Sequence, residues 1–101
     1  MPDDLDAIIH APARLRIMAA LAASPDGSLL EFKRLRVLLG LTDGNLGAHI
    51  ATLESAGYVA VTKDFEGKRP RTRIAATKAG HAAYRAHVAA LRAILDGGDV
   101  G

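Results

Sequence analysis

The sequence has no cysteine, so neither a disulfide framework nor a thiolate metal site is available to it. Aromatic residues make up only 4% of the chain, although residues of the set AVILMFWYC make up 50%. Because alanine supplies much of that half, we expect a helical and thinly packed core. No run of about 18 apolar residues occurs, so no membrane-spanning helix is expected.

The chain also lacks a basic segment ahead of an apolar stretch at its start, which is MPDDLD. We therefore expect no secretory signal peptide and a cytoplasmic protein. The 101 residues suffice for one domain with a modest core. We expect that domain to cover residues 1–96 and the glycine-rich end, residues 97–101, to be a disordered tail.

Charge is distributed unevenly along the chain, although the formal net charge is only +2. All 13 lysines and arginines lie between residues 7 and 95, where six acidic residues accompany them. The remaining acids stand at the two ends of the chain: Asp3, Asp4, Asp6, Asp96 and Asp99. A basic body with acidic ends favours a polyanionic partner such as a nucleic acid.

Apolar residues recur at helical spacing through the first half of the chain, which predicts four helices. The first covers Leu5 to His10, and the second begins at Pro12, since proline is tolerated at the first helical position. The third lies in residues 28–40, and the fourth is capped by Thr42 after a short turn. The expected core face of the third helix consists of four residues: Phe32, Leu35, Leu38 and Leu39. Two helices joined by a short turn containing glycine indicate a helix-turn-helix.

The second half predicts a β-hairpin and one more helix. YVAVTKDF alternates and is rich in β-branched residues, FEGK forms a turn, and RPRTRIA returns as the partner strand. Pro70 lacks a backbone donor, so its strand should be an edge or irregular near its start. Thr77 then begins the last helix. This order predicts a mainly α fold with a two-stranded β-wing, namely a winged helix-turn-helix with N- and C-terminal dimerisation helices.

The stretch LTDGNLGAHIATLESAGYVAVTKDFEGKRPRTR, residues 41–73, resembles the winged-helix regulators of the MarR/ArsR-like group. The likeness is greatest to their small form, in which the recognition helix opens with LTDGNL and the wing carries F-x-G-x-x-P-x-T. HAPARLRIMAAL before this stretch and T-x-x-G after it extend the resemblance over Leu5 to Leu95. The resemblance implies a homodimeric DNA-binding transcription regulator, with DNA contacts from Asp43 to Thr52 and from Lys68 to Arg73.

Two positions depart from the pattern of that group. Gly47 stands where serine is usual, which removes a contact to phosphate or base. Ala76 stands where a larger apolar residue is usual, so the wing should pack less firmly. Gly44 and Gly47 also each cost the fourth helix about 1 kcal/mol relative to alanine.

Candidate DNA contacts lie on the fourth helix and on the hairpin. Asn45 can pair with adenine and His49 can donate to a base edge or a phosphate, since residues four apart share a helical face. The other candidates on this helix are: Thr42, Asp43, Ala48 and Thr52. The candidates on the hairpin are four cations suited to phosphates or a narrow minor groove: Lys68, Arg69, Arg71 and Arg73. Two alternatives stay open, because Asn45 can instead serve the helix start and the cations can pair with Asp64 and Glu66.

The last helix carries an apolar stripe at steps of three and four residues, as in helices that pack along one another. The stripe can contact this chain's own first helix, the same helices of a second copy, or both. We expect a two-fold homodimer through the terminal helices, because symmetric regulators bind two half-sites. The expected interface consists of seven residues: Leu5, Ile8, Ile9, Tyr84, Val88, Leu91 and Leu95.

Patterns typical of metal sites and enzymes are lacking. His81 and His87 lie six residues apart, which suits no single helical face, so neither a metal nor another cofactor is expected. No nucleophile elbow or glycine-rich phosphate loop occurs, so we do not expect an enzyme. The favoured interpretation is a sequence-specific DNA-binding regulator. The alternative is a winged-helix protein-interaction module without specific DNA binding, and a further one is a ligand-sensing regulator with a pocket beside the terminal helices.

Overall fold

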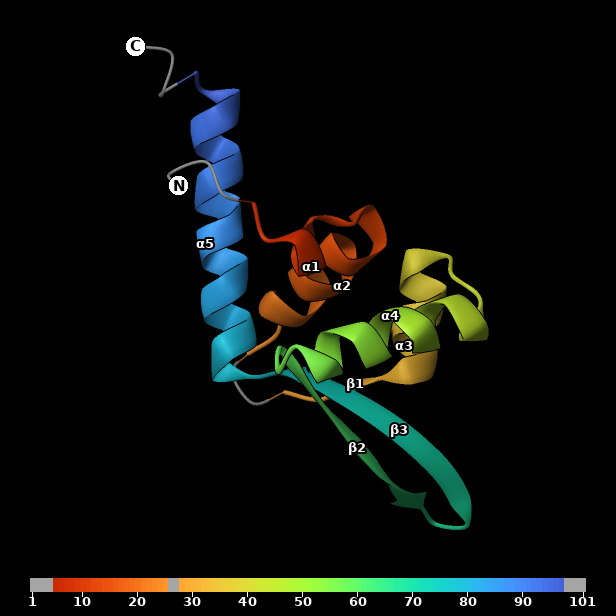
Figure 1. Ribbon diagram of the computed structural model, residues 1–101. Coiled ribbons are helices and arrows are strands. Elements are labelled where there is room, and N and C mark those ends of the chain that lie inside the picture. The colour runs from red at the N-terminus through yellow and green to blue at the C-terminus, as the bar shows by residue number, and fades with distance from the viewer. Residues whose placement is uncertain (1–4, 26–27, 98–101) are drawn as a thin grey trace.

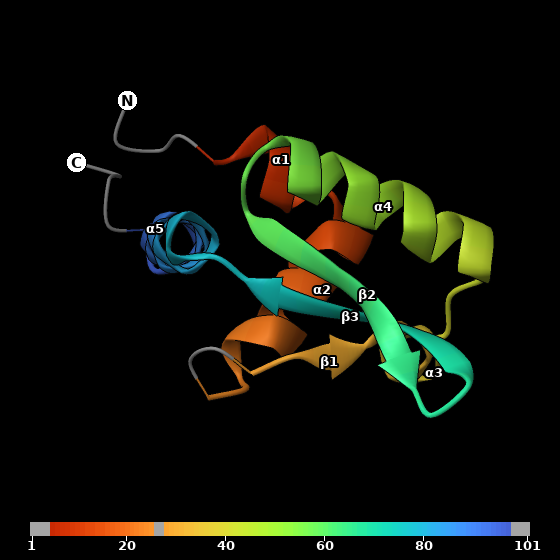
Figure 2. The same ribbon diagram turned by 90° about the horizontal axis from the view of Figure 1, so that it is seen from below.

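The computed structural model describes residues 5–25 and 28–97 (Figure 1). The helices over these residues are α1 Ala7–His10, α2 Pro12–Ala22, α3 Phe32–Leu39, α4 Asp43–Ser55 and α5 Lys78–Leu95. The strands are β1 Leu30–Glu31, β2 Val59–Glu66 and β3 Arg69–Ala76. Helices α1 to α4 gather on one side of the small sheet, while α5 and the β2–β3 hairpin leave this body in opposite directions (Figures 1 and 2). The expected winged-helix fold is confirmed.

The expected two-stranded wing is confirmed as the β2–β3 hairpin. A short third strand, β1, was not expected and extends the antiparallel sheet to the order β1-β3-β2. The expected third helix also began too early, because Leu30 pairs with Ile74 and Glu31 with Arg73 instead. This short strand supplies partners for backbone groups on the inner half of β3, which would otherwise lack them beside the core. Since β1 ends opposite Arg73, the half of β3 that contains Pro70 is an edge on that side, as expected.

Local signals at the helix ends agree with the structure. The Thr42 hydroxyl accepts a hydrogen bond from the N–H of Asn45 at 3.1 Å and caps α4, and Thr77 caps α5 in the same way through Gly80. Gly40 ends α3 with a φ of 66°, a conformation that glycine adopts without a steric penalty. The turn between α3 and α4 is thus fixed at both ends, and it sets the angle at which α4 is presented.

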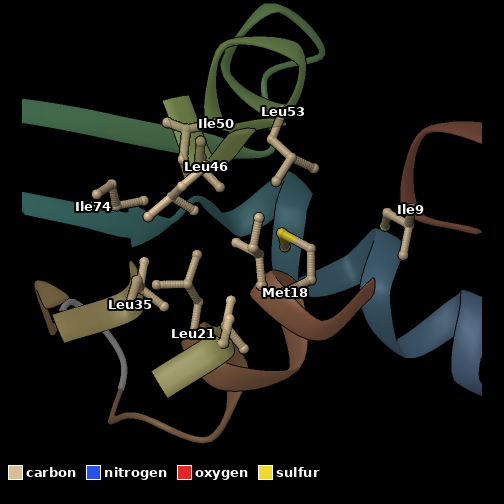
Figure 3. Close-up of a cluster of buried hydrophobic side chains, with 11 residues drawn as sticks. Ile9, Met18, Leu21, Leu35, Leu46, Ile50, Leu53 and Ile74 are labelled. Carbon is tan, nitrogen blue, oxygen red and sulfur yellow. The ribbon is translucent and has the colours of Figure 1, made fainter. Parts of the chain in front are cut away.

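One hydrophobic core joins the helix-turn-helix to the sheet and to α1. Figure 3 shows side chains from α2, α3 and α4 converging beside Ile74 of β3. The core consists of eleven residues: Ile9, Ile17, Met18, Leu21, Leu35, Leu39, Leu46, Ile50, Leu53, Val59 and Ile74. Leu38, expected in the core, is 63% exposed, because the buried stripe of the short α3 runs through Leu35 and Leu39.

The start of α5 lies against the end of the loop before β2, and only glycine fits at that contact. A Cβ added to Gly80 would lie 2.0 Å from the carbonyl oxygen of Tyr58. The same carbonyl accepts the N–H of Thr77 at 3.0 Å, and the Thr77 hydroxyl donates to the carbonyl of Gly57 at 2.6 Å. The Gly80 position therefore decides where α5 can begin.

Replacing Gly80 with alanine should lower the free energy of unfolding by about 1–3 kcal/mol, because backbone must move to admit the new methyl group. Gly47→Ala is the matched control, since a Cβ there meets nothing within 4 Å and the residue lies inside a helix. This second change should raise the free energy of unfolding by about 0.4–1 kcal/mol. Urea unfolding of both variants measures the two effects. Equal stability of the two variants would contradict the close approach at Gly80.

Candidate nucleic-acid interface

The exposed surface of α4 carries mostly small side chains. Asn45 and Ala48 are exposed, and Ala51 and Ser55 continue the same face toward the end of the helix. Thr52 is half-buried, and its hydroxyl donates to the carbonyl of Ala48 at 3.1 Å. Small side chains along this face let the helix backbone come close to a partner surface. The structure therefore brings Asn45, Ala48 and Thr52 together on an open face, as the sequence predicted.

The first turn of α4 is held to α3. The Asp43 carboxylate lies 2.9 Å from Nε of Arg36, although the Asp43 side chain is 80% exposed. Thr42 is exposed as well, but its hydroxyl oxygen is occupied by the N–H of Asn45. Thr42 and Asp43 thus stabilise the turn and orient Asn45. Asn45 is exposed, and its part in the helix start involves only its backbone N–H.

His49 is directed toward the body of the protein. Its ring is half-buried, and Nδ1 lies 3.3 Å from a terminal nitrogen of Arg14 on α2. The same guanidinium donates from Nε to the carbonyl of Ile8 at 2.5 Å. His49 therefore connects α4 to α1 and α2 through Arg14. The structure separates it from the open face on which Asn45 lies, even though the two residues are four apart.

The hairpin has two distinct faces, which follow from its register. Lys63 pairs with Thr72 and Phe65 with Pro70, so these four side chains lie on the face that Val61 shares with the core. We call this the inner face of the wing. Asp64 pairs with Arg71 and Glu66 with Arg69 on the opposite, outer face.

A hollow of about 590 Å³ separates the inner face of the wing from α4. Lys63 and Thr72 line it from the hairpin, and Gly47, Ala51 and Glu54 line it from α4. Gly47 has no side chain, and a Cβ added there would meet nothing within 4 Å, so the hollow is open on the side of the helix.

Two of the four wing arginines and lysines are neutralised within the hairpin. Nε of Arg71 lies 2.7 Å from one Asp64 oxygen, and a terminal nitrogen of Arg73 lies 2.6 Å from the other. Arg71 also approaches Glu66 at 3.5 Å. The hydrogen bond from Arg71, aided by Arg73 and opposed by burial, lowers the pKa of Asp64. The alternative of pairing with wing acids therefore holds for Arg71 and Arg73, and explains how the cations are accommodated together.

Among the residues that the structure describes, the remaining cations of the wing form no ion pair. Lys63 lies on the inner face, Lys68 in the turn at the tip, and Arg69 opposite Glu66 on the outer face. Sequence reasoning did not include Lys63, nor Ala51 on α4, among the candidate contacts. The alternation of YVAVTKDF contained the signal for Lys63, because it places that residue in line with Val61 on the core side.

The second helix of the helix-turn-helix is exposed and carries small side chains, and the hairpin after it carries cations without ion-pair partners among the described residues. These features together suit binding to double-stranded DNA. The family model described as a winged helix DNA-binding domain matches residues 13–95. The chain belongs to this family. The resemblance seen in the sequence is thereby confirmed at the level of the family and the fold.

Similar sequences and solved structures come from three organisms. A protein of Methanocaldococcus jannaschii, described as uncharacterized, is 33% identical over 81 residues, or 80% of this chain and 85% of that protein. The structure of a transcriptional regulator homologue from Pyrococcus horikoshii OT3 matches with a TM-score of 0.81 and 35% identity, over 91% of this chain and 88% of that one. A MarR family transcriptional regulator from Silicibacter pomeroyi matches with a TM-score of 0.66 and 24% identity, over 89% and 57%. This last likeness shows the fold alone.

The terminal helices of the winged helix domain differ in how much surface they leave open. Ile9 has no exposed surface and belongs to the core, so its assignment to a dimer interface was wrong. Ile8 and Tyr84 are partly buried against that core. At the far end of α5, by contrast, Leu95 is 80% exposed. Leu5, Val88 and Leu91 are half-buried. Of the expected disordered tail, residues 98–101 lie outside the described residues.

A small polar cluster fastens the N-terminal segment of the winged helix domain to α5. The buried His87 accepts the N–H of Asp6 at Nδ1 (3.1 Å), and its Nε2 lies 3.5 Å from Nδ1 of His10. Tyr58 donates to the Asp6 carboxylate at 2.5 Å. Burial, and next the charge of nearby His10, lower the pKa of His87, while Asp6 acts in the opposite direction. Nδ1 of His87 can accept this hydrogen bond only when the imidazole is neutral. Protonation of His87 therefore breaks its hydrogen bond with the N–H of Asp6.

Stability should therefore fall as the pH drops below about 6.5, the ordinary histidine pKa. Below that value the unfolded chain binds a proton at His87 that the folded chain resists, whereas above it both states are neutral. His87→Asn keeps an acceptor near the position of Nδ1 but does not titrate. Urea unfolding between pH 5 and pH 8 should show a smaller loss of stability in acid for this variant than for wild type. Identical pH profiles would show that His87 is not the titrating group.

Two further properties concern the described residues only. None of the helices over residues 5–25 and 28–97 is long and apolar enough to cross a membrane. Within the same part of the chain, no three histidine, aspartate or glutamate side chains come together as a metal site would require.

Proposed function

We propose that this winged helix domain is a sequence-specific transcriptional regulator that binds double-stranded DNA as a homodimer, in the cytoplasm and without enzymatic activity. The observation that carries the proposal is the open groove between α4 and the inner face of the wing. The groove has a helix with small side chains on one side and Lys63 on the other. Lys68 and Arg69 extend the positive charge to the end of the hairpin, and this combination suits the shape and charge of a duplex.

In this proposal, α4 enters the major groove and the wing lies on the adjacent backbone or minor groove. Asn45 is the side chain best placed to form paired hydrogen bonds with an adenine, and Ala48 and Thr52 approach the bases beside it. Lys63, Lys68 and Arg69 meet phosphates and supply affinity without base preference. Arg71 and Arg73 pair with Asp64 and so stabilise the conformation of the hairpin. They contribute to DNA binding mostly by positioning the wing.

The homodimer is proposed to form through the far end of α5. Leu95 and Ile94 are exposed there at 80% and 43%, and Leu91 and Val88 continue the stripe toward the body. Burying a large apolar side chain stabilises an assembly by roughly 1.5–3 kcal/mol. A second copy of α5 offers the same surface in return, as two-fold symmetry requires. The dimer then presents two α4 helices to an inverted repeat with half-sites about one helical turn apart.

The rival function is a protein-interaction module that uses the same hairpin and helix. Selection from a random pool of duplexes by the full-length protein separates the two. The proposed function predicts recovery of a common inverted-repeat motif. A pool that stays random after repeated rounds would contradict sequence-specific binding and favour the rival.

Asn45→Ala should weaken binding to the selected duplex by about 1–3 kcal/mol and leave binding to a shuffled duplex unchanged. The reason is that the amide would lose hydrogen bonds made only with the correct base. Ser55→Ala, on the same face but at the end of the helix, serves as the control. Fluorescence anisotropy with both duplexes measures the effect. Equal preference for the selected duplex in Asn45→Ala and wild type would remove Asn45 from base recognition.

A further inference from the structure

Phe65 is an exposed aromatic residue at the tip of the wing. It is one of two phenylalanines in the chain, and 67% of its surface is open to solvent. In the register of the hairpin it stands opposite Pro70, just before the turn at Gly67. Its alternation with Lys63 places it on the inner face of the wing, beyond the hollow beside α4. Phe65 and Pro70 together form an apolar tip.

Exposure alone does not indicate a contact, because single exposed apolar residues are common on protein surfaces. The surroundings of this apolar tip are more informative. Lys63 lies on the same face, and Lys68 and Arg69 follow at and just after the turn, none of them in an ion pair among the described residues. Asp64 and Glu66, by contrast, are engaged with arginines on the outer face. An apolar tip with free cations around it matches a surface that combines phosphates with apolar sugars and base faces. A DNA minor groove is such a surface.

We propose that Phe65, supported by Pro70, is an apolar wedge that enters the minor groove and partly unstacks one base step. The proposal rests on the proposed function, because α4 in the major groove is what brings the projecting hairpin to the neighbouring minor groove (Figure 1). Phenylalanine and proline are among the side chains that proteins insert in this way, and the duplex kinks as a result. The wedge selects flexible pyrimidine–purine steps at positions that no hydrogen bond reads.

Three variants test the wedge: Phe65→Ala removes it, Phe65→Leu keeps an apolar side chain, and Phe65→Lys exchanges it for a cation. The probe is the duplex selected by the wild-type protein, labelled at both ends for energy transfer, so that affinity and bending are measured together. Phe65→Ala should bind roughly 5–30-fold more weakly, bend the duplex less, and keep the wild-type salt slope. Phe65→Leu should retain most of the bend. Phe65→Lys should not restore the bend although it adds a phosphate-binding charge.

The wedge is overturned if Phe65→Ala binds and bends the duplex like wild type, or if Phe65→Lys binds as tightly as wild type. The first result would indicate that Phe65 contacts a protein partner and not DNA. The second would indicate that the residue at position 65 contacts a phosphate. Thermal melting of each variant shows whether the fold is kept, and Phe65→Leu gives the decision if Phe65→Ala is unstable. A failure of the proposed function looks different, because wild type itself would then select no duplex.

Discussion

Replacing Lys63, Lys68 and Arg69 together with alanine should weaken binding to every duplex by about 100-fold at 0.1 M salt. Each cation that meets a phosphate releases a counterion, so the slope of log affinity against log salt should become shallower by roughly 0.9 per lost contact. The loss should be similar for the selected and the shuffled duplex, because phosphates carry no sequence information. Anisotropy titrations at several salt concentrations measure both quantities.

A matched control removes the same number of charges elsewhere. Lys78, Arg85 and Arg92 are exposed on α5, and their replacement by alanine changes the net charge equally. This control should keep nearly the wild-type salt slope. If both triple variants lose affinity and slope to the same extent, the wing contributes only general charge and does not contact DNA.

The second large effect concerns assembly. Leu91→Glu with Leu95→Glu should turn the dimer into a monomer and weaken binding to the selected inverted repeat by 100-fold or more. Two linked domains gain about 10²–10⁴ in affinity over one, because binding of the first makes binding of the second intramolecular. Leu95 is largely exposed, so its change should leave the fold of the single chain intact. Sedimentation and anisotropy measure the two outcomes.

Ala89→Glu with Ala93→Glu provides the control, because both alanines are exposed and lie on the opposite side of α5 from Leu91. This variant should remain a dimer with wild-type affinity. A wild-type protein that sediments as a monomer at micromolar concentration, and binds one chain per site at full affinity, would contradict the dimer.

Much of the fold follows from local signals in the sequence. Thr42 and Thr77 cap helices, Gly40 ends one, and the alternating residues before and after FEGK form the hairpin. Each of these features depends on residues close in the chain. The strand at Leu30 and Glu31 was missed because two residues are too few to show alternation, and its partner lies more than 40 positions away.

The site was harder to predict, since it depends on which side chains meet across elements. The sequence left open whether Arg71 and Arg73 bind DNA or pair with wing acids, and only the register of the hairpin, which brings Asp64 between them, decides this. His49 has suitable spacing from Asn45, yet Arg14 of α2 holds its ring toward the body. Ile9 is an apolar residue on a terminal helix, as an interface residue would be, but its side chain is buried in the core. Such assignments need the tertiary contacts that the pattern of one element does not contain.

The central claim is that α4 reads bases while the cations of the wing bind the backbone. It is tested most directly by the affinity of wild-type protein for the selected and the shuffled duplex over a range of salt concentrations. The account predicts a steep fall of both affinities with salt, and tighter binding of the selected duplex by about 10³-fold or more at physiological salt. Equal affinities for the two duplexes, with a flat dependence on salt, would contradict it.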